Sequence, residues 1–208
     1  MSADALLSIW LQSALIGLSI AAPVGPIGLL TIQRSLNQGA AAGLATGLGA
    51  AVADALYGAV GAFGVSALVT WLTWARVPLA LGGGVFLLWL AWRSWSAPPA
   101  QQAAAAPGGA DLLRCFAGTF VLTLSNPATI LSFIAVFGTL AGRLQTGAPW
   151  TMVSGVLAGS ALWWLALSQM VARGRRHFDL RWRTRVNRAS ALALVTFALW
   201  QWASLWRG

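Results

Sequence analysis

Residues 39–67 read GAAAGLATGLGAAVADALYGAVGAFGVSA, a run of small and apolar residues that contains a single acid, Asp54. The run is long enough to cross a bilayer as a helix, which takes about 20 apolar residues. An ionisable side chain at that depth is costly, so it is expected to face the protein interior or a water-filled path. The other acids of the chain, Asp4, Asp111 and Asp179, lie at a terminus or in connections. A buried acid of this kind is typical of a transporter and is not needed by a membrane anchor.

The composition extends this interpretation to the whole chain. Of the 208 residues, 58% are hydrophobic and 8% are charged, which argues against a soluble domain. Six apolar segments approach the length of a membrane crossing. They are Leu6–Ile32 (interrupted), Ala40–Leu68, Val77–Trp95, Leu112–Leu140 (interrupted), Trp150–Val171 and Ala189–Trp206. The short connections leave no room for a soluble catalytic domain, so we predict one all-α membrane domain of about six helices over residues 1–208.

A segment rich in Pro, Ala, Gln and Gly, APPAQQAAAAPGGA at residues 97–110, divides the chain into two halves. This composition is typical of a flexible linker. The halves, residues 1–96 and 111–208, would each hold three crossings, and an odd number makes related halves inverted in the membrane. Each half opens with a crossing that proline interrupts, at Pro23–Pro26 and after Asn126. We therefore predict an inverted 3+3 repeat, in which matching interruptions mark a transporter binding site.

The two interruptions predict open backbone inside the membrane. Pro23, Gly25 and Pro26 should unwind the first crossing, because proline lacks a backbone donor and clashes with the preceding turn. Asn126 and Pro127 suit the cap and the first residue of a half-helix. The amino end of a half-helix presents free amides and a positive dipole end, which suits the carboxylate of a small zwitterion. A pair of purely structural kinks is the alternative.

Asp54 shares one face of its helix with a row of glycines. At 3.6 residues per turn, that face holds Gly39, Gly43, Gly47, Asp54, Gly58 and Gly61. Glycines spaced by four residues let another helix approach closely, so Asp54 is expected to point into a packed interface. Burial favours the neutral form of a carboxyl group, which would suit a proton or cation carrier. The alternative is a carboxylate bonded permanently to the backbone opened at Pro23–Pro26.

Two further side chains are candidates for the same site. Tyr57 is the only tyrosine and lies at the edge of the Asp54 face. It would either hydrogen-bond Asp54 or the substrate, or serve only in packing. Arg34 closes the first crossing, and it would either bind a substrate carboxylate or anchor the helix at the membrane interface.

Arginine supplies all of the positive charge, and seven of the thirteen arginines fall in one connection, residues 173–188. A basic loop beside anionic lipid explains this connection better than nucleic-acid binding does. With six crossings, Arg34, Arg93 and Arg114 lie on the same side as that loop. The positive-inside rule then predicts a cytoplasmic 173–188 loop and both termini outside.

The motifs of the chain, taken in order, resemble those of one family. They are Pro23-Val24-Gly25-Pro26-Ile27-Gly28-Leu29-Leu30, Arg34-Ser35-Leu36, Gly39, Ala42-Gly43-Leu44, Gly47-Leu48-Gly49, Asp54, and Asn126-Pro127-Ala128-Thr129-Ile130-Leu131-Ser132-Phe133. Over essentially the whole chain they are similar to the LysE/RhtB family of amino-acid exporters. The resemblance implies a bacterial plasma-membrane exporter of amino acids or close derivatives. It also implies coupling to the proton gradient and assembly as a homo-oligomer, expected to be a dimer.

The resemblance also implies which residues form the site. The family's aspartate of the second crossing matches Asp54. Its proline–glycine–proline element and its asparagine–proline pair match Pro23, Gly25, Pro26, Asn126 and Pro127. Two departures lie at this site: Ala128 stands where many members have lysine, and Val24 is inserted in the first element. Both departures concern the substrate more than the family.

Other functions have less support in the sequence. An exporter of another small solute or of a cation, built on the same fold, is the alternative. Transport of a metal ion would normally need several membrane-embedded carboxylates, histidines or thiols, and only Asp54 qualifies. Cys115 is the only cysteine, and His177, the only histidine, lies among the arginines. We therefore expect no metal site, no cofactor and no enzyme activity.

Overall fold

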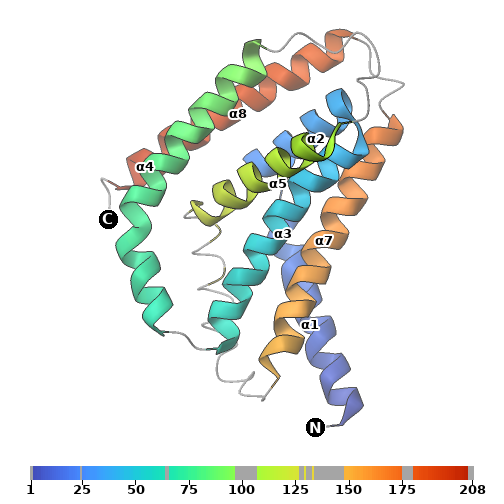
Figure 1. Cartoon of the computed structure of the whole chain (residues 1–208), viewed down its shortest axis with the longest axis vertical. Helices are drawn as coiled ribbons and strands as arrows, with labels where there is room; N and C mark the ends of the chain where they lie inside the picture. Colours follow the sequence, from blue (N-terminus) through green and yellow to red (C-terminus); the bar gives the residue numbers. More distant parts are fainter. Residues whose placement is uncertain are drawn as a thin grey trace.

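A computed structural model describes residues 2–23, 25–63, 66–96, 107–126, 129, 133, 148–174 and 180–205. Throughout these ranges the regular structure is α-helical, as predicted, and Figure 1 shows the helices. They are α1 (Ala3–Ala21), α2 (Pro26–Gln38), α3 (Ala40–Phe63), α4 (Ser66–Ser96), α5 (Gly109–Leu124), α7 (Pro149–Gly174) and α8 (Leu180–Leu205).

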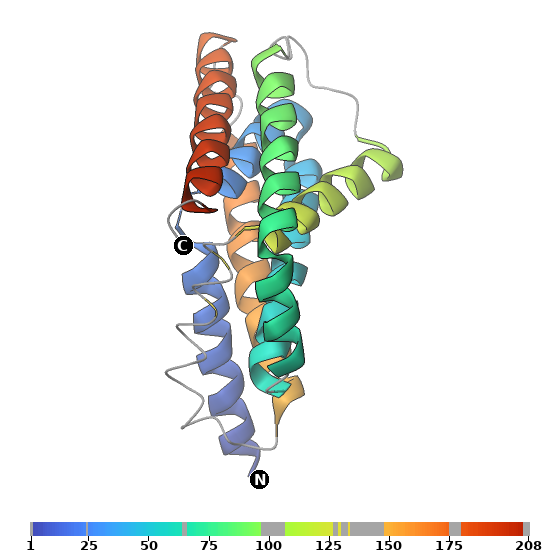
Figure 2. The same ribbon diagram turned by 90° about the vertical axis from the view of Figure 1, so that its left-hand side faces the viewer.

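Three of the described helices, α1, α3 and α7, are long and apolar enough to cross a membrane. Helix α7 packs against both α1 and α3, and these three form the long body of the molecule (Figure 1). Helices α4 and α8 pair with each other, and Figure 2 shows them side by side with α5 slanting out of the bundle. Helix α3 therefore lies at the centre, in contact with α2, α5 and α7.

The first crossing is interrupted where the prolines predict. Helix α1 ends at Ala21, and α2 begins at Pro26, whose missing donor costs nothing at the first helical position. In between, the backbone N–H of Gly25 donates to the carbonyl of Pro23 at 2.9 Å. Gly39 then separates α2 from α3 with φ of 96°, a left-handed conformation that favours glycine.

The second interruption begins where Asn126 predicts. Helix α5 ends at Leu124, and the backbone N–H of Ser125 donates to Val121 at 3.0 Å. The N–H of Asn126 donates to Thr123 at 3.1 Å, which closes the last turn. Pro127 and the half-helix predicted to follow it lie outside the described residues.

The predicted start of the third crossing is wrong. We predicted a crossing from Val77, but α4 begins at Ser66 and continues through Pro78. Proline removes one backbone donor, which a long helix can absorb as a bend, and α4 is visibly bent in Figure 1. The helix therefore includes residues that hydropathy assigns to the previous crossing and its connection.

The arginine-rich connection is also shorter than predicted. We predicted a loop over residues 173–188, but α7 continues to Gly174 and α8 begins at Leu180 rather than at Ala189. Arginine is a good helix former, so its charge does not end a helix. The first turns of α8 instead carry four arginines, and Arg188 lies over the ring of Trp95 on α4 at 5.6 Å. Residues 175–179 and most of the 97–110 linker lie outside the described residues, and α5 already begins at Gly109.

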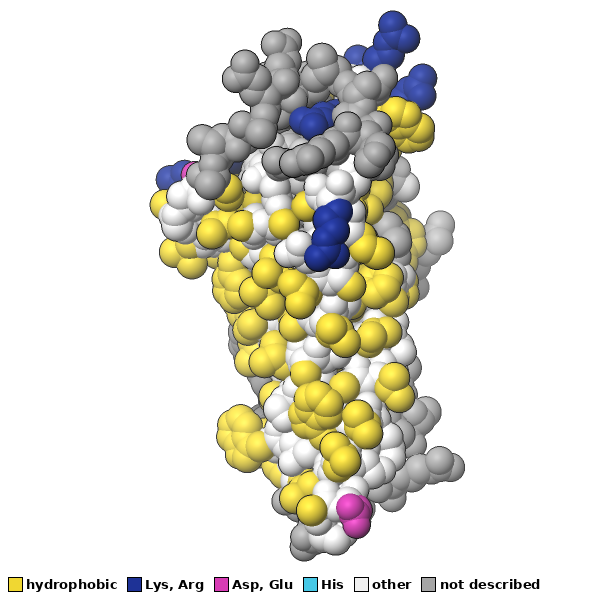
Figure 3. All heavy atoms as spheres, turned by 90° about the vertical axis from the view of Figure 1, so that its right-hand side faces the viewer, with side chains coloured by type: hydrophobic (Ala, Val, Ile, Leu, Met, Phe, Trp, Pro, Cys, Tyr) yellow, Lys and Arg dark blue, Asp and Glu magenta, His cyan; other side chains and the backbone are white. Residues whose placement is uncertain are grey.

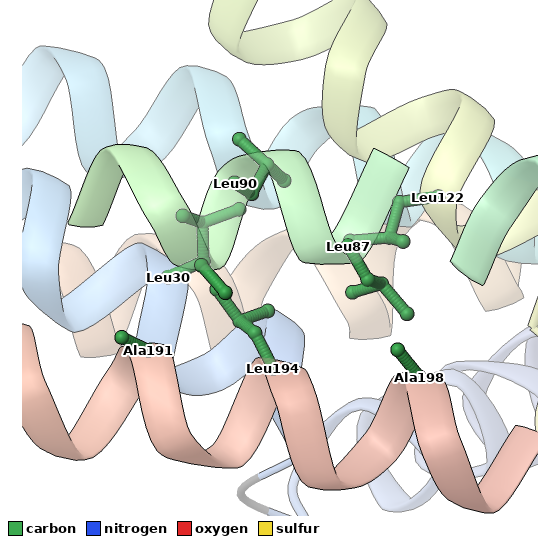
Figure 4. Packing of buried hydrophobic residues seen from close by; sticks show 8 residues of the cluster. Leu30, Leu87, Leu90, Leu122, Ala191, Leu194 and Ala198 are labelled. Carbon is green, nitrogen blue, oxygen red and sulfur yellow. The ribbon is translucent and has the colours of Figure 1, made fainter. Parts of the chain in front are cut away.

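An apolar cluster fixes α4 and α8 against α2 and α5 (Figure 4). Its buried members are Leu30, Leu87, Leu90, Ala91, Leu122, Ala191, Leu194 and Ala198. Ala191 and Ala198 lie on α8 and let its backbone approach the leucines of α4 closely. This cluster attaches the α4–α8 pair to the helices that carry the two interruptions.

Candidate functional site

Asp54 lies deep between α3 and α7. Its exposed fraction is 3%, and the hydroxyl of Ser160 on α7 donates to its Oδ2 at 2.8 Å. A buried carboxylate needs hydrogen bonds or a counter-charge to offset its desolvation. Within the part of the chain that the structure describes, the one recorded ion pair joins Arg114 to Asp111 on the surface. Asp54 is therefore held by a neutral donor.

The glycine face of α3 packs against α7 as predicted. A Cβ added at Gly47 would overlap Trp164, and one at Gly43 would overlap the hydroxyl of Ser35 and lie 3.2 Å from Cβ of Ser168. A Cβ at Gly58 would meet Val156 at 3.4 Å, which is an ordinary contact. A larger residue would therefore clash at Gly43 and Gly47, which precede Asp54, whereas Gly58, which follows it, has room for a methyl group.

Two glycines of the predicted face do not belong to this interface. Gly61 is exposed, because it lies within one turn of the end of α3. Gly39 precedes α3 and acts as the left-handed residue after α2. The face that contacts α7 is therefore shorter than the sequence period predicts.

The first interruption lies at the depth of Asp54. Ala21, the last residue of α1, packs with Ala50 and Ala51 of α3 and with Trp164 of α7. Ile20 packs in the next cluster, which contains Tyr57 of α3. Asp54 lies between these two levels on its own helix. The end of α1 is therefore opposite the turn of α3 that carries the acid.

The second interruption reaches the same region through Tyr57. The Tyr57 hydroxyl donates to the carbonyl of Leu124, the last residue of α5, at 2.7 Å. Its ring lies 5.5 Å from that of Phe133. We predicted a bond to Asp54 or the substrate, or packing alone. In the structure, Tyr57 instead donates to a backbone carbonyl at the end of α5, and its ring packs beside that of Phe133.

Gln201 is a residue of this region that sequence reasoning missed. Its side-chain amide donates to the carbonyl of Ser125 at 3.2 Å and to that of Ala80 at 2.9 Å. Gln201 is 1% exposed, and it ties α8 and α4 to the end of α5. A glutamine within an apolar helix is the signal that could have identified it, because such an amide must find partners inside the protein.

Arg34 lies apart from this group, towards the end of α2. One of its terminal nitrogens donates to Oγ1 of Thr46 at 2.9 Å, to the carbonyl of Cys115 at 3.2 Å and to Oγ1 of Thr119 at 3.4 Å. These acceptors lie on α3 and α5. The guanidinium therefore turns inward and joins three helices, which differs from a side chain that only anchors a helix end at the interface.

The open backbone of the first interruption is accessible. No side chain caps α2 at Gly25, and a Cβ added there would meet no atom within 4 Å. Pro23 is exposed, whereas Gly25 and Pro26 are half-buried. The structure thus brings Asp54, Tyr57, the first interruption and the approach to Asn126 to one depth.

Comparison with known proteins identifies relatives over most of the chain. The model of the LysE type translocator family matches residues 18–201. The uncharacterized membrane protein YahN of Escherichia coli K12 is 35% identical over 143 residues, 67% of this chain and 64% of YahN. The chemotactic transduction protein ChpE of Pseudomonas aeruginosa is 27% identical, covering 91% of this chain and 95% of ChpE.

The arginine exporter protein ArgO of Enterobacter sp. 638 is 26% identical over 170 residues, 80% of each chain. No solved structure matches this chain.

Proposed function

The chain belongs to the LysE type translocator family, and from that premise we propose that it exports amino acids or close derivatives across the bacterial plasma membrane. Its similarity to a protein named as an arginine exporter supports this class of substrate. The observation that carries the proposal is the buried Asp54, bonded to Ser160 at the depth of both interruptions. A chain that only anchored a partner would gain nothing from an acid there.

We propose that Asp54 couples export to the proton gradient. A carboxyl group whose recorded partner is a single hydroxyl can be neutral or charged without breaking an ion pair. Its helix, α3, contacts helices of both halves of the chain. Loading and release of a proton would therefore change the charge at the interface that must rearrange during transport.

The substrate carboxylate is assigned to the first interruption. The amino end of α2 has Pro26 at its first position and no side-chain cap, so its free amides and dipole suit an anion. Gly25 leaves open space beside them. Asn126 and Pro127 are assigned the matching role in the second half. Tyr57 and Arg34 are assigned to holding the helices around this site.

The pattern of helix contacts supports six crossings in an inverted 3+3 repeat. If the halves correspond, α1, α3 and α4 match α5, α7 and α8. Exchanging the halves then converts the α1–α7 contact into the α5–α3 contact, and both are extensive. The same exchange converts the α3–α7 and α4–α8 pairs into themselves, and both exist.

We assign the arginine-rich end to the cytoplasm and both termini to the outside. Basic side chains gather towards one end of the molecule in Figure 3, where α4 and α7 end and α8 begins in Figure 1. The positive-inside rule supports this orientation. Single cysteines made as Ser2→Cys and Arg181→Cys, in a Cys115→Ala background, should label from outside and from inside respectively. Assembly as a dimer is proposed from the family resemblance, and cross-linking in membranes tests it.

The decisive experiment compares two identical substitutions. Cells that make the protein are loaded with a panel of amino acids and toxic analogues, and export is measured as tolerance and as release of label. Asp54→Asn should abolish export while the protein remains inserted. Asp4→Asn is the matched control, because Asp4 is exposed in the first turn of α1. Full export by the Asp54→Asn protein would refute the coupling role, and export of only non-amino-acid solutes would refute the substrate class.

A further inference from the structure

We propose that the seam between α2, α3 and α7 is the path by which water reaches Asp54 from the arginine-rich end. The seam is defined by residues from three helices. They are Thr31 and Ser35 of α2, Gly43 and Gly47 of α3, and Ser160, Trp164 and Ser168 of α7. The inference rests on the proposed function, because it concerns how Asp54 exchanges protons with one side of the membrane.

Three polar groups of the seam are buried and unpaired. They are Oγ1 of Thr31, Oγ of Ser35 and Nε1 of Trp164, and none of them has a hydrogen-bond partner in the described part of the chain. Thr31 and Ser35 are 0% exposed and Trp164 is 3% exposed. Folded proteins pair nearly all such groups, with ordered water where no protein group is available. Three unpaired groups on two neighbouring helices therefore indicate a position for water.

The Ser35 hydroxyl faces the seam. The Ser35 hydroxyl lies where a Cβ of Gly43 would be, and Cβ of Ser168 lies 3.2 Å from that point. One turn further along α3, Trp164 lies against Gly47. The next polar level is Ser160, which is bonded to Asp54. The polar groups thus follow one another from the ends of α2 and α7 down to the acid.

The spacing of these levels suits single water molecules. Ser160, Trp164 and Ser168 recur every four residues on α7, and Thr31 and Ser35 do so on α2. One helical turn rises about 5.4 Å. This is the span of two hydrogen bonds of about 2.8 Å that share one water. The close approach at Gly43 and Gly47 leaves no room for an amino acid in this state.

The two sides of Asp54 differ, which sets the direction of the path. Beyond Asp54, away from the seam, Tyr57 packs with Met152 and Val156, and its hydroxyl is bonded to the carbonyl of Leu124, whereas the three unpaired groups belong to the seam. The remaining charged or titratable side chains on the helices around α3 lie elsewhere than the seam. They are Asp4 on α1, Arg34 on α2, Asp111, Arg114 and Cys115 on α5, and Arg173 on α7.

The test uses single cysteines placed in a background from which Cys115 has been removed. Cys115→Ala removes it and keeps the carbonyl that Arg34 uses. Into this background we would place Ser35→Cys, Thr31→Cys or, as the control, Ala198→Cys, which is 0% exposed in the apolar cluster of α4 and α8. A thiol-reactive cation of about the size of a water molecule, the silver ion, is applied to membrane vesicles of each orientation, and the rate at which the free thiol is lost is measured.

We expect the seam cysteines to react about ten-fold or more faster than the Ala198→Cys control, and faster from the arginine-rich side. Rates equal to the control, or faster reaction from the opposite side, would overturn the inference. If Ser35→Cys does not fold, Thr31→Cys gives the same test one turn away. Thiol modification requires no transport, so a protein that fails to export but reacts in the seam would refute the proposed function alone. A protein that exports with an unreactive seam would refute this inference alone.

Discussion

Ser160 donates a 2.8 Å hydrogen bond to Asp54, and this bond joins α7 to α3. Asp54 is the one acid within a predicted crossing, and the bond from Ser160 is the hydrogen bond that its side chain accepts. The first half supplies a carboxyl group to this contact and the second half supplies a hydroxyl, so the coupling chemistry we propose is asymmetric.

Removal of this hydroxyl should destabilise the protein through the acid. Ser160→Ala leaves a buried carboxylate without its donor, which should cost about 1–3 kcal/mol of unfolding free energy. The loss should be smaller in an Asp54→Asn background, because a neutral amide is cheaper to bury than a charge. Thermal unfolding in detergent measures both effects when it compares the wild type, Ser160→Ala, Asp54→Asn and the double variant.

Ser154→Ala is the matched control for that cycle. Ser154 lies on the same helix, is exposed, and donates only to the carbonyl of Thr151 at 3.0 Å. Its substitution should leave the unfolding temperature nearly unchanged. Equal losses for Ser160→Ala with and without Asp54 would show that the hydroxyl does not act through the acid.

A second prediction concerns the close contact of α3 with α7. Gly47→Ala places a methyl group on Trp164 near the α7 backbone, so one helix must move, and we expect a loss of about 1–3 kcal/mol. Gly58→Ala has the same chemistry on the same face, but its methyl group would meet Val156 at 3.4 Å, so it should be tolerated. Yield and thermal stability in detergent decide between them. Equal tolerance of both variants would contradict the contact at Gly47.

The interruptions and the glycine face could be predicted because each depends on local chemistry. The prolines at positions 23 and 26 flank a glycine, and two lost backbone donors within four residues break a helix. Glycine recurring every four residues leaves a smooth strip wherever the helix lies. Boundaries that depend on context were missed. Pro78 lies inside α4 because the neighbouring helical turns outweigh its local preference. Arginines lie inside α8 because a drop in hydropathy ends a predicted crossing without ending the helix.

The partners of the site residues could not be predicted, because they depend on the rotation of one helix against another. Polar side chains occur at several positions around α7, so the sequence alone does not show which of them faces Asp54. Only packing selects the face that carries Ser160, Trp164 and Ser168. Gln201 reaches carbonyls of α4 and α5 that are more than 70 residues away in sequence, which no local pattern encodes.

A third prediction tests the role of Tyr57 at the second interruption. Tyr57→Phe keeps the ring beside Phe133 and removes the donor to Leu124, so it should cost about 1 kcal/mol of stability. Tyr57→Ala also removes the ring packing and should cost about 3–5 kcal/mol. Thermal unfolding separates the two variants. A Phe variant as unstable as the Ala variant would show that the hydroxyl, not the ring, dominates.

A fourth prediction tests whether Arg34 joins helices, as we propose, or binds the substrate carboxylate. All three recorded bonds of its side chain come from one nitrogen, and their acceptors are two hydroxyls and one carbonyl. A lysine ammonium also carries three donors, so Arg34→Lys should retain most of the stability and export. Arg34→Leu, which keeps an apolar stem and leaves Thr46 and Thr119 without this donor, should lose both. If Arg34 instead held a substrate carboxylate with its planar fork, lysine would fail as leucine does, while the unfolding temperature of the lysine protein would stay near that of the wild type. Export assays and unfolding curves on the two variants therefore distinguish a residue that joins three helices from one that binds the transported molecule.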